Sequence, residues 1–331
     1  MNIEARSGKI LVTGGAGYIG SVLVRLLLDE GRQVLVVDNL SFGGESIVEL
    51  LNYDNFEFVR GDIRDESLMQ RLLQGVSAVA HLAAIVGDPA CAQDPELTRS
   101  INLDGSKRLY QLANEAGVKQ FIFASTCSNY GKMDDPNGYV AETSTLAPVS
   151  LYAETKVAFE RFLLSHADQS VDCVPTCLRF STVYGLSPRL RFDLTVNEFA
   201  KELALGRELV IFGEQFWRPY CHVVDLSRSV LSVLNASTDK VAFEVFNVGD
   251  TKENYQKKMI VDEIKKRLPT AKISYVERHE DPRDYRVNCD KIRDVLGFAI
   301  TKTVSDGVDQ ILQVVQDHFI QDPDSQRYRN V

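Results

Sequence analysis

Short apolar runs rich in β-branched residues alternate with amphipathic stretches through the first half of the chain. This alternation predicts a doubly wound α/β fold, in which crossover helices cover both faces of a parallel sheet. The expected strands are Lys9–Thr13, Gln33–Asp38, Phe56–Arg60, Ala78–Leu82, Gln120–Ala124 and Cys173–Phe180. The expected helices are Ile19–Glu30, Ser67–Leu73, Pro95–Ala116 and Ser150–Ala167, with Gly31 and Gly117 at helix ends.

Beyond Tyr184 the pattern is interrupted by Gly and Pro, and fewer elements are readable. We expect a helix at Leu194–Leu205, a strand at Glu208–Phe212, and a helix at Leu226–Asn235 with Asp225 as its N-cap. Phe243–Val248 has the composition of a strand that returns to the main sheet. We therefore expect residues 1–185, with a return segment near 220–250, to form a nucleotide-binding domain, and residues 186–331 to form mainly a smaller α/β substrate-binding domain.

Composition narrows the class of protein. Hydrophobic residues make up 44% and charged residues 25%, which are ordinary values for a folded globular chain. A net charge of −9 argues against a nucleic-acid partner. The sequence has no secretory signal pattern and no run of about 18 apolar residues, so we expect a cytoplasmic protein without a membrane partner. Its six cysteines show no CxxC pair and no zinc-ligand spacing, so we expect reduced thiols and no metal.

The first strand is followed at once by a glycine-rich turn and a helix, which is the context of a dinucleotide-binding fingerprint. Gly14 makes the tight turn, Gly17 lets a pyrophosphate approach the helix N-terminus, and Gly20 permits close packing of helix and sheet. Asp38 ends the second strand, eighteen positions after Gly20, where a carboxylate accepts hydrogen bonds from adenosine ribose hydroxyls. That carboxylate repels a 2′-phosphate, so the expected cofactor is NAD.

Tyr152 and Lys156 stand four residues apart, on one face of the expected helix. A lysine ammonium and a cationic nicotinamide both stabilise a phenolate, which lowers the pKa of the tyrosine toward the working pH. After a dinucleotide fingerprint, this spacing indicates a catalytic pair.

In their order along the chain, these motifs resemble those of the extended short-chain dehydrogenase/reductase family with its Rossmann fold, and more narrowly the NAD-dependent nucleotide-sugar epimerase/dehydratase group. The matching segments are Thr13–Gly20, Asp62-Ile63, His81–Ala84, Asn102, Ser125–Gly131, Tyr152 with Lys156, and Arg179–Gly185. The resemblance implies a nucleotide-diphosphate sugar as substrate. It also implies a homodimer, which Pro95–Ala116 and Ser150–Ala167 would form, although both helices are equally compatible with simply covering the sheet.

The resemblance also implies residue roles. Besides the glycines and Asp38, the expected cofactor contacts are Tyr18, Ile19, Asn39, Asp62, Ile63, Leu82, Ala83, Ala84, Asn102, Ser125, Tyr152 and Lys156. Thr126 is expected beside the reacting hydroxyl, together with Ser125. The expected substrate contacts are Arg218 and Arg283, which match diphosphate-binding arginines, together with Thr182, Asn197, Arg189 and Arg191. Arg189 and Arg191 are equally compatible with ordinary surface arginines. His81 and His222 are interpreted as packed residues.

Departures from the family pattern bear on the reaction. The resembling 4,6-dehydratases carry Asp and Glu after the active-site Thr, and the decarboxylases carry a Glu there, whereas this chain has Cys127 and Ser128. Thr182 replaces a usual Asn. The leading hypothesis is an epimerase that oxidises the sugar to a transient ketone, and the expected position of oxidation is C4. A 4-ketosugar reductase, a dehydratase or decarboxylase, and an inactive NAD-binding protein are the alternatives. Cys127 is either a second acid/base facing the sugar or a small buried thiol.

The first prediction concerns cofactor choice. Because Asp38 would lie beside a 2′-phosphate and residues 39–41 offer no arginine, NAD should bind at least about tenfold more tightly than NADP, or about 1.4 kcal/mol. Calorimetric titration of both dinucleotides measures the ratio, and equal affinities would contradict this role for Asp38.

Overall fold

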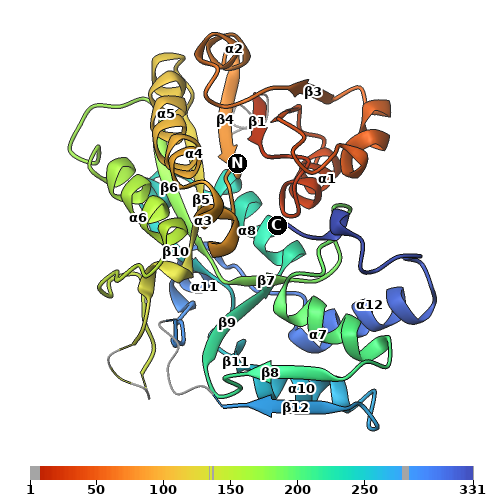
Figure 1. Cartoon of the computed structure of the whole chain (residues 1–331). Helices are drawn as coiled ribbons and strands as arrows, with labels where there is room; N and C mark the ends of the chain where they lie inside the picture. Colours follow the sequence, from red (N-terminus) through yellow and green to blue (C-terminus); the bar gives the residue numbers. More distant parts are fainter. Residues whose placement is uncertain (1–7, 134, 136–137, 278–282, 331) are drawn as a thin grey trace.

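The computed structural model describes residues 8–133, 135, 138–277 and 283–330. In this part of the chain, seven parallel strands form the main sheet in the order β10-β6-β5-β4-β1-β2-β3 (Figure 1). Their bounds are β1 Lys9–Thr13, β2 Val34–Asp38, β3 Phe56–Arg60, β4 Val76–His81, β5 Gln120–Thr126, β6 Val174–Phe180 and β10 Val245–Val248. The doubly wound parallel sheet predicted from the sequence is confirmed, and the segment expected to return to it supplies the edge strand β10.

Alternate residues of the strands face two separate hydrophobic clusters. Ile10 and Val12 pack with helices α1 (Gly20–Asp29), α8 (Val223–Asn235) and α11 (Asp290–Leu296). Leu11, between them in the strand, faces α2 (Glu66–Leu72), α5 (Ser106–Glu115) and α6 (Leu151–Leu164) on the other side. This arrangement brings the carboxyl ends of all the parallel strands to one edge, which is where ligands bind in such sheets.

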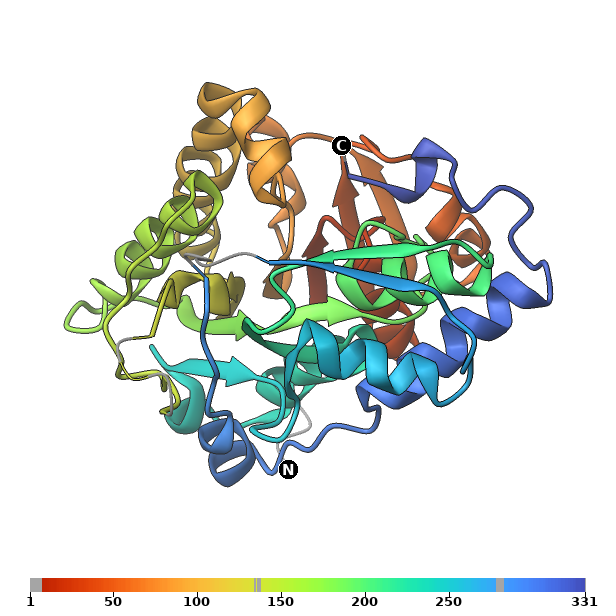
Figure 2. The ribbon, with the colours of Figure 1, turned by 60° about the horizontal axis from the view of Figure 1, so that its bottom comes forward.

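A third hydrophobic cluster lies beyond the main sheet. It is built by α7 (Thr195–Ala204), α10 (Lys257–Lys265) and α12 (Val304–Gln316) around β8 (Leu209–Phe212) and β9 (Trp217–His222). β9 pairs with β7 (Thr182–Tyr184) and β11 (Asn254–Gln256). β8 runs beside β12 (Ile273–Val276), as Figure 2 shows. The remaining short elements are η2 Glu45–Asn52, α3 Asp88–Gln93, α4 Pro95–Arg99, η3 Ser100–Gly105, η4 Cys127–Tyr130, α9 Thr238–Val241 and η5 Gln326–Tyr328.

Two sequence-based assignments need correction. Helix α8 begins at Val223 and its N-cap is His222, whose Nδ1 accepts a hydrogen bond from the Val224 amide, so Asp225 is not the cap. The stretch expected as one helix over Pro95–Ala116 contains the π-helical turn η3 between α4 and α5. Asn102 lies in that turn, and its amide group pairs with both backbone groups of Ile85. A π-turn of this kind often occurs at functional sites.

No helix among residues 8–133, 135, 138–277 and 283–330 is both long enough and apolar enough to span a bilayer.

Asp225 is fully buried and anchors a distant loop. Its carboxylate accepts hydrogen bonds from the amides of Thr301 and Lys302 and from the Thr301 hydroxyl, and it pairs with Arg228 at 2.7 Å. These contacts fix the loop that leads into α12 against the first turn of α8.

The second prediction tests this anchor. Asp225→Asn removes the charge and turns one acceptor into a donor, leaving a buried amide facing another amide. We expect the free energy of unfolding to fall by about 1–3 kcal/mol. Urea unfolding measures the change. Glu244→Gln, which alters a carboxylate in a half-exposed ion pair with Lys291, is the control and should change stability by less than about 1 kcal/mol. An equal loss in both variants would contradict the anchoring role.

Candidate active site

The turn between β1 and α1 has no room for side chains at its first and last glycine. Gly14 has a φ of +75°, and a Cβ there would lie 2.8 Å from the Ala83 nitrogen. A Cβ on Gly20 would lie 2.2 Å from the Gly14 carbonyl oxygen. The turn therefore places the amino end of α1, where residues 17–20 lie, close to the carboxyl ends of β1 and β4. This bare backbone cradle fits a dinucleotide diphosphate.

Asp38 ends β2 beside this cradle. Its two carboxylate oxygens accept hydrogen bonds from the Ala16 amide at 3.0 Å and the Leu40 amide at 2.8 Å. Burial raises the pKa of Asp38, and these two backbone hydrogen bonds oppose the rise. A carboxylate held against the glycine turn, with Asn39 next to it, fits the ribose-binding role, so the residues present fit NAD.

The other expected cofactor contacts lie at the same edge of the sheet. Leu82–Ala84 follow β4, and the Ala83 amide donates to the Thr13 hydroxyl at 3.3 Å. Ile63 is buried after β3, while the Asp62 carboxylate binds the Arg64 guanidinium through two hydrogen bonds. Asn102 holds Ile85 rather than pointing a free amide at the site. The structure thus gives Asn102 a positioning role for the loop after β4.

Tyr152 and Lys156 lie on one face of α6, with the Lys156 Nζ 5.8 Å from the centre of the Tyr152 ring. Nζ donates to the Ala124 carbonyl at 2.8 Å, which fixes it against the end of β5. Burial lowers the pKa of Lys156 to about 7. Burial raises the pKa of Tyr152, and a hydrogen bond with Thr126 opposes this rise. The protein thus brings Thr126, Tyr152 and Lys156 together, and burial favours the uncharged form of both titratable groups.

Ser125 is placed differently from the expectation that it lies beside the reacting hydroxyl. Its hydroxyl donates to Glu160 at 2.8 Å and accepts from the Asn129 amide at 3.1 Å. Glu160 in turn forms a buried ion pair with Arg179, whose Nη1 also donates to the Tyr130 hydroxyl at 2.8 Å. Sequence reasoning missed Glu160. Its spacing was the available signal, because it lies one further step of four beyond Lys156 on the helix face that carries Tyr152.

Cys127, predicted to be either an acid/base facing the sugar or a buried thiol, lies in an enclosed position. The side chain is 1% exposed and its thiol donates to the Arg179 carbonyl at 3.2 Å. It packs with Tyr130, Tyr285 and Cys289 in a small hydrophobic cluster. Burial raises the pKa of Cys127 to about 12. The buried-thiol interpretation is therefore the one the structure supports.

The six expected substrate contacts fall into separate places. Arg218 lies 5.5 Å from the Tyr285 ring, and Arg283 forms an ion pair with Asp88 at 2.7 Å. Thr182 lies in β7, next to Tyr220 of β9. Arg189, Arg191 and Asn197 form a second group.

This second group lies against the glycine turn. Arg191 pairs with Asp193 and lies 5.9 Å from the Tyr18 ring. Asn197 is fully buried, and its amide hydrogen-bonds to the backbone of Gly185 and Arg191 and to the Tyr18 hydroxyl. Asn197 therefore shapes the loop after β7 instead of offering its amide to a ligand.

Both packed histidines are buried and hydrogen-bonded, as expected. His81 lies between the hydroxyls of Thr13 and Ser106, and burial lowers its pKa to about 3. His222 bonds to Gln310 at 2.8 Å, and burial lowers its pKa as well. Neither ring is a proton carrier at neutral pH. The described residues also contain no group of three or more His, Cys, Asp or Glu side chains suited to a metal ion.

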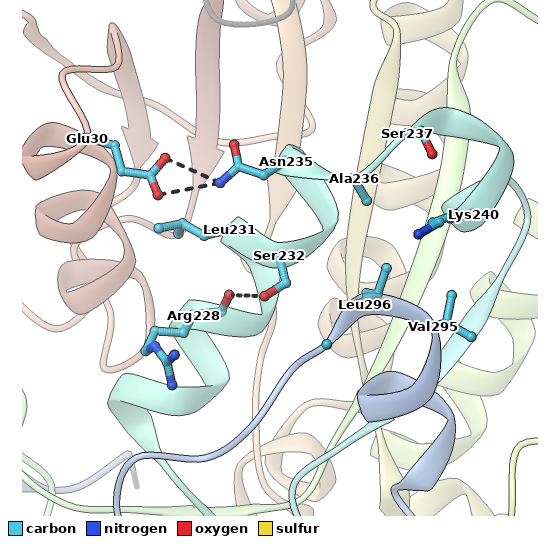
Figure 3. A pocket seen from close by; sticks show the side chains of 11 residues that line it. Glu30, Arg228, Leu231, Ser232, Asn235, Ala236, Ser237, Lys240, Val295 and Leu296 are labelled. Atoms are coloured by element: carbon cyan, nitrogen blue, oxygen red, sulfur yellow. Dashed lines mark hydrogen bonds between the residues drawn. The ribbon is translucent and has the colours of Figure 1, made fainter. Parts of the chain in front are cut away.

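An open hollow of about 650 Å³ lies elsewhere, between the carboxyl ends of α1, α8 and α11 (Figure 3). Glu30 and Asn235 hydrogen-bond across it, and Leu231 and Leu296 line it. It contains none of the predicted site residues and lies toward the opposite edge of the sheet. This hollow is therefore separate from the edge that carries Thr126, Tyr152 and Lys156.

Residues 10–249 match the model of the NAD-dependent epimerase/dehydratase family. The chain belongs to this family. It is 30% identical over 327 residues to UDP-glucose 4-epimerase from Lactobacillus helveticus, covering 92% of this chain and 94% of that protein. It is 34% identical over 316 residues to dTDP-glucose 4,6-dehydratase from Actinoplanes sp., covering 91% and 95%. Its structure resembles that of UDP-glucuronic acid 4-epimerase from Bacillus cereus in complex with UDP-glucuronic acid and NAD (TM-score 0.83, 26% identity, 93% and 99% covered).

These comparisons confirm the resemblance to the extended short-chain dehydrogenases and the Rossmann fold. This epimerase/dehydratase is an enzyme whose cofactor is NAD. The glycine cradle and Asp38 are the features of this chain that fit the dinucleotide.

The third prediction concerns Lys156 in NAD-free protein. Its pKa falls from 10.5 to about 7 on folding, so between these values the unfolded chain binds a proton that the folded protein lacks. The contribution of Lys156 to stability therefore rises with pH over this window, by at most about 1.4 kcal/mol per pH unit. We expect Lys156→Met to be more stable than wild type at pH 7, with a smaller difference at pH 9.

Urea unfolding at both pH values provides the measurement. Lys119→Met, which removes an exposed lysine, is the control and should differ from wild type by the same amount at both. A difference for Lys156→Met that does not change with pH would contradict the buried, depressed ammonium.

Proposed function

We propose that the enzyme is a nucleotide-sugar 4-epimerase that oxidises the sugar at C4 and reduces the 4-keto intermediate on its other face. Relatives named UDP-glucose 4-epimerase and UDP-glucuronic acid 4-epimerase support this reaction class. The dehydratase relative at 34% identity represents the main competing reaction.

Each of the three grouped residues has a defined task in this proposal. The Tyr152 phenolate removes the proton of the C4 hydroxyl. The Thr126 hydroxyl, which is hydrogen-bonded to Tyr152, orients the C4 oxygen. Lys156 remains against the Ala124 carbonyl and, when charged, stabilises the phenolate. NAD, when bound, supplies the acceptor and donor of the hydride. Return of the proton from Tyr152 to the C4 oxygen completes the cycle.

The buried position of Cys127 is the observation that carries the choice of reaction. Elimination or decarboxylation requires further proton transfer at C5 or C6, and the resembling enzymes provide a carboxyl group at this position. Here the residue is an enclosed thiol, with its pKa raised to about 12 by burial and its proton directed at a carbonyl. An epimerisation that needs only Thr126, Tyr152 and Lys156 fits the site best.

The charge around Tyr152 supports a neutral sugar. Asp88 lies close enough to Tyr152 to raise its pKa electrostatically, as a lesser contribution than burial. Its ion-pair partner Arg283 is proposed, with Arg218, to bind the substrate diphosphate through guanidinium forks. Once Arg283 turns to the diphosphate, the Asp88 carboxylate repels a uronate and accepts hydrogen bonds from hydroxyls. We therefore propose a neutral hexose rather than a hexuronic acid.

Product analysis by NMR tests the proposal. With UDP-glucose, UDP-glucuronic acid and dTDP-glucose as a panel, the expected product is the 4-epimer of a neutral sugar, without net consumption of NAD. Tyr152→Phe, which deletes only the ionisable hydroxyl, should retain less than a few per cent of activity and bind NAD nearly as wild type does.

Two outcomes would redirect the proposal. A 4-keto-6-deoxy sugar as final product would make the enzyme a dehydratase. Stoichiometric oxidation of added NADH by a 4-ketosugar, in a protein that retains no NAD through purification, would make it a reductase.

The fourth prediction follows from the position of Cys127. Cys127→Ala should leave turnover within about twofold of wild type, because the thiol does not handle protons. It should lower the free energy of unfolding by about 1 kcal/mol, since a small buried group is lost. Steady-state kinetics and urea unfolding, with Cys173→Ala as a matched buried-thiol control, provide the measurements. Loss of turnover in Cys127→Ala alone, with the fold intact, would restore the acid/base hypothesis.

We also propose a cytoplasmic homodimer formed through α5 and α6. Sedimentation of the purified enzyme tests the dimer.

A further inference from the structure

Arg189 is a buried arginine whose hydrogen bonds are incomplete. Arg189 is only 6% exposed, and its Nη2 donates a hydrogen bond to the Arg329 carbonyl at 2.8 Å. Its Nε and Nη1 have no hydrogen-bond partner within the described part of the chain. A guanidinium is charged at neutral pH, and a buried charge without a counter-charge is strongly unfavourable. Asp193 interacts electrostatically with Arg189 but accepts no hydrogen bond from Nε or Nη1. These two donors are therefore available to an acceptor from outside the chain.

The segment around Arg189 lies against the cofactor cradle. The Ser187 hydroxyl donates to the Tyr18 carbonyl at 2.6 Å, at the amino end of α1. The Arg189 guanidinium lies 4.5 Å from the ring of Phe42, in the loop that follows Asp38. Ser46, which donates to the Ala16 carbonyl, lines the same small hollow as Arg189. Arg189 thus lies among residues that surround the glycine turn and the loop after Asp38.

The hollow itself limits what can enter. Its volume is about 60 Å³, and its walls carry the two arginines Arg189 and Arg327 and one carboxylate, Glu45, so the cationic groups outnumber the anionic one. This is roughly the liquid volume of two water molecules. The space accommodates oxygens of an anionic group, and it is too small for a base or a sugar ring.

The C-terminal segment 322–330 holds Arg189 in place. The Tyr328 carbonyl accepts from the Phe192 amide at 2.9 Å, and the Asn330 amide donates to Asp193 at 3.1 Å. Asp324 pairs with the buried Lys201 of α7. In Figure 1 this end of the chain lies beside α1, and in Figure 2 it again lies against the N-terminal half. The last described residues therefore form one side of the hollow that Arg189 lines.

We propose that Arg189 is a cofactor-binding residue, whose Nε–H and Nη1–H donate to a phosphate oxygen of the NAD diphosphate while segment 322–330 fixes the guanidinium. This assigns Arg189 to the dinucleotide and leaves the sugar-nucleotide diphosphate to Arg218 and Arg283. The amino end of α1 and the Arg189 fork then bind the same diphosphate from two sides. The inference rests on NAD as cofactor and not on the identity of the sugar.

Calorimetric titration of NAD-free protein with NAD and, separately, with UDP tests this assignment. Arg189→Gln should weaken NAD binding about 10- to 100-fold, Arg189→Lys should weaken it less, and both should bind UDP within twofold of wild type. Arg327→Gln is the matched control, because Arg327 lines the same hollow but is exposed to solvent. It should bind NAD within twofold of wild type.

Three outcomes would overturn the assignment. Unchanged NAD affinity in Arg189→Gln would remove Arg189 from the cofactor site. A selective loss of UDP affinity would assign it to the substrate diphosphate. Equal losses for both ligands, with a lowered melting temperature in both Arg189 variants, would reduce it to a structural residue. Failure of wild type to bind UDP would count against the proposed sugar-nucleotide substrate and leave the NAD comparison intact.

Discussion

The buried ion pair between Glu160 and Arg179 is the constraint on which the active site depends. Both side chains are almost fully enclosed, at 1% and 4% exposure, so neither charge has an alternative partner in solvent. Removing one partner of such a pair leaves an uncompensated buried charge, which costs several kcal/mol. The pair joins α6 to β6 and, through Ser125, to β5. It therefore fixes both the rotation and the height of the helix that carries Tyr152 and Lys156.

The electrostatics of the site follow from the same enclosure. Burial lowers the pKa of Lys156 to about 7 and raises that of Tyr152, so near pH 7 the ligand-free site holds a neutral phenol beside a partly deprotonated lysine. A low-dielectric site disfavours isolated ions, and both shifts favour the uncharged form. Charge separation becomes favourable only when a phenolate, an ammonium and a cationic ring are present together.

The sequence was most informative where local rules act. The glycine turn, Asp38, the strands of the main sheet and the Tyr152–Lys156 face all follow from short-range spacing, and the structure has each of these elements. Helix α12 was missed although Thr303 and Asp306 form a capping box and apolar residues recur from Val304 to Val315. Gly and Pro interrupt the hydrophobic pattern in the second half of the chain, which makes this helical periodicity harder to recognise.

Side-chain direction was much harder to predict, because it depends on partners far away in the sequence. The Cys127 thiol turns toward Arg179, 52 positions along the chain, and Ser125 turns toward Glu160, 35 positions along. Nothing adjacent to either residue indicates these partners. Asn197 was likewise predicted to contact the substrate, but its amide group is hydrogen-bonded to the backbone of the loop after β7. Family resemblance locates such residues at the site but does not say where their polar atoms point.

The sheet topology has a mechanical consequence. The elements that form the third hydrophobic cluster are not joined to the main sheet by a single linker. Along the chain, β10 (residues 245–248) comes between β9 and β11, and it forms the edge strand of the main sheet. The chain returns to the main sheet again with α11, and its last described residues contact Arg189. A cluster of elements tethered to the sheet at several points resists hinge-like rotation. Under the proposed function, closure around the substrate would then come from loops and side chains, such as Arg283 leaving Asp88.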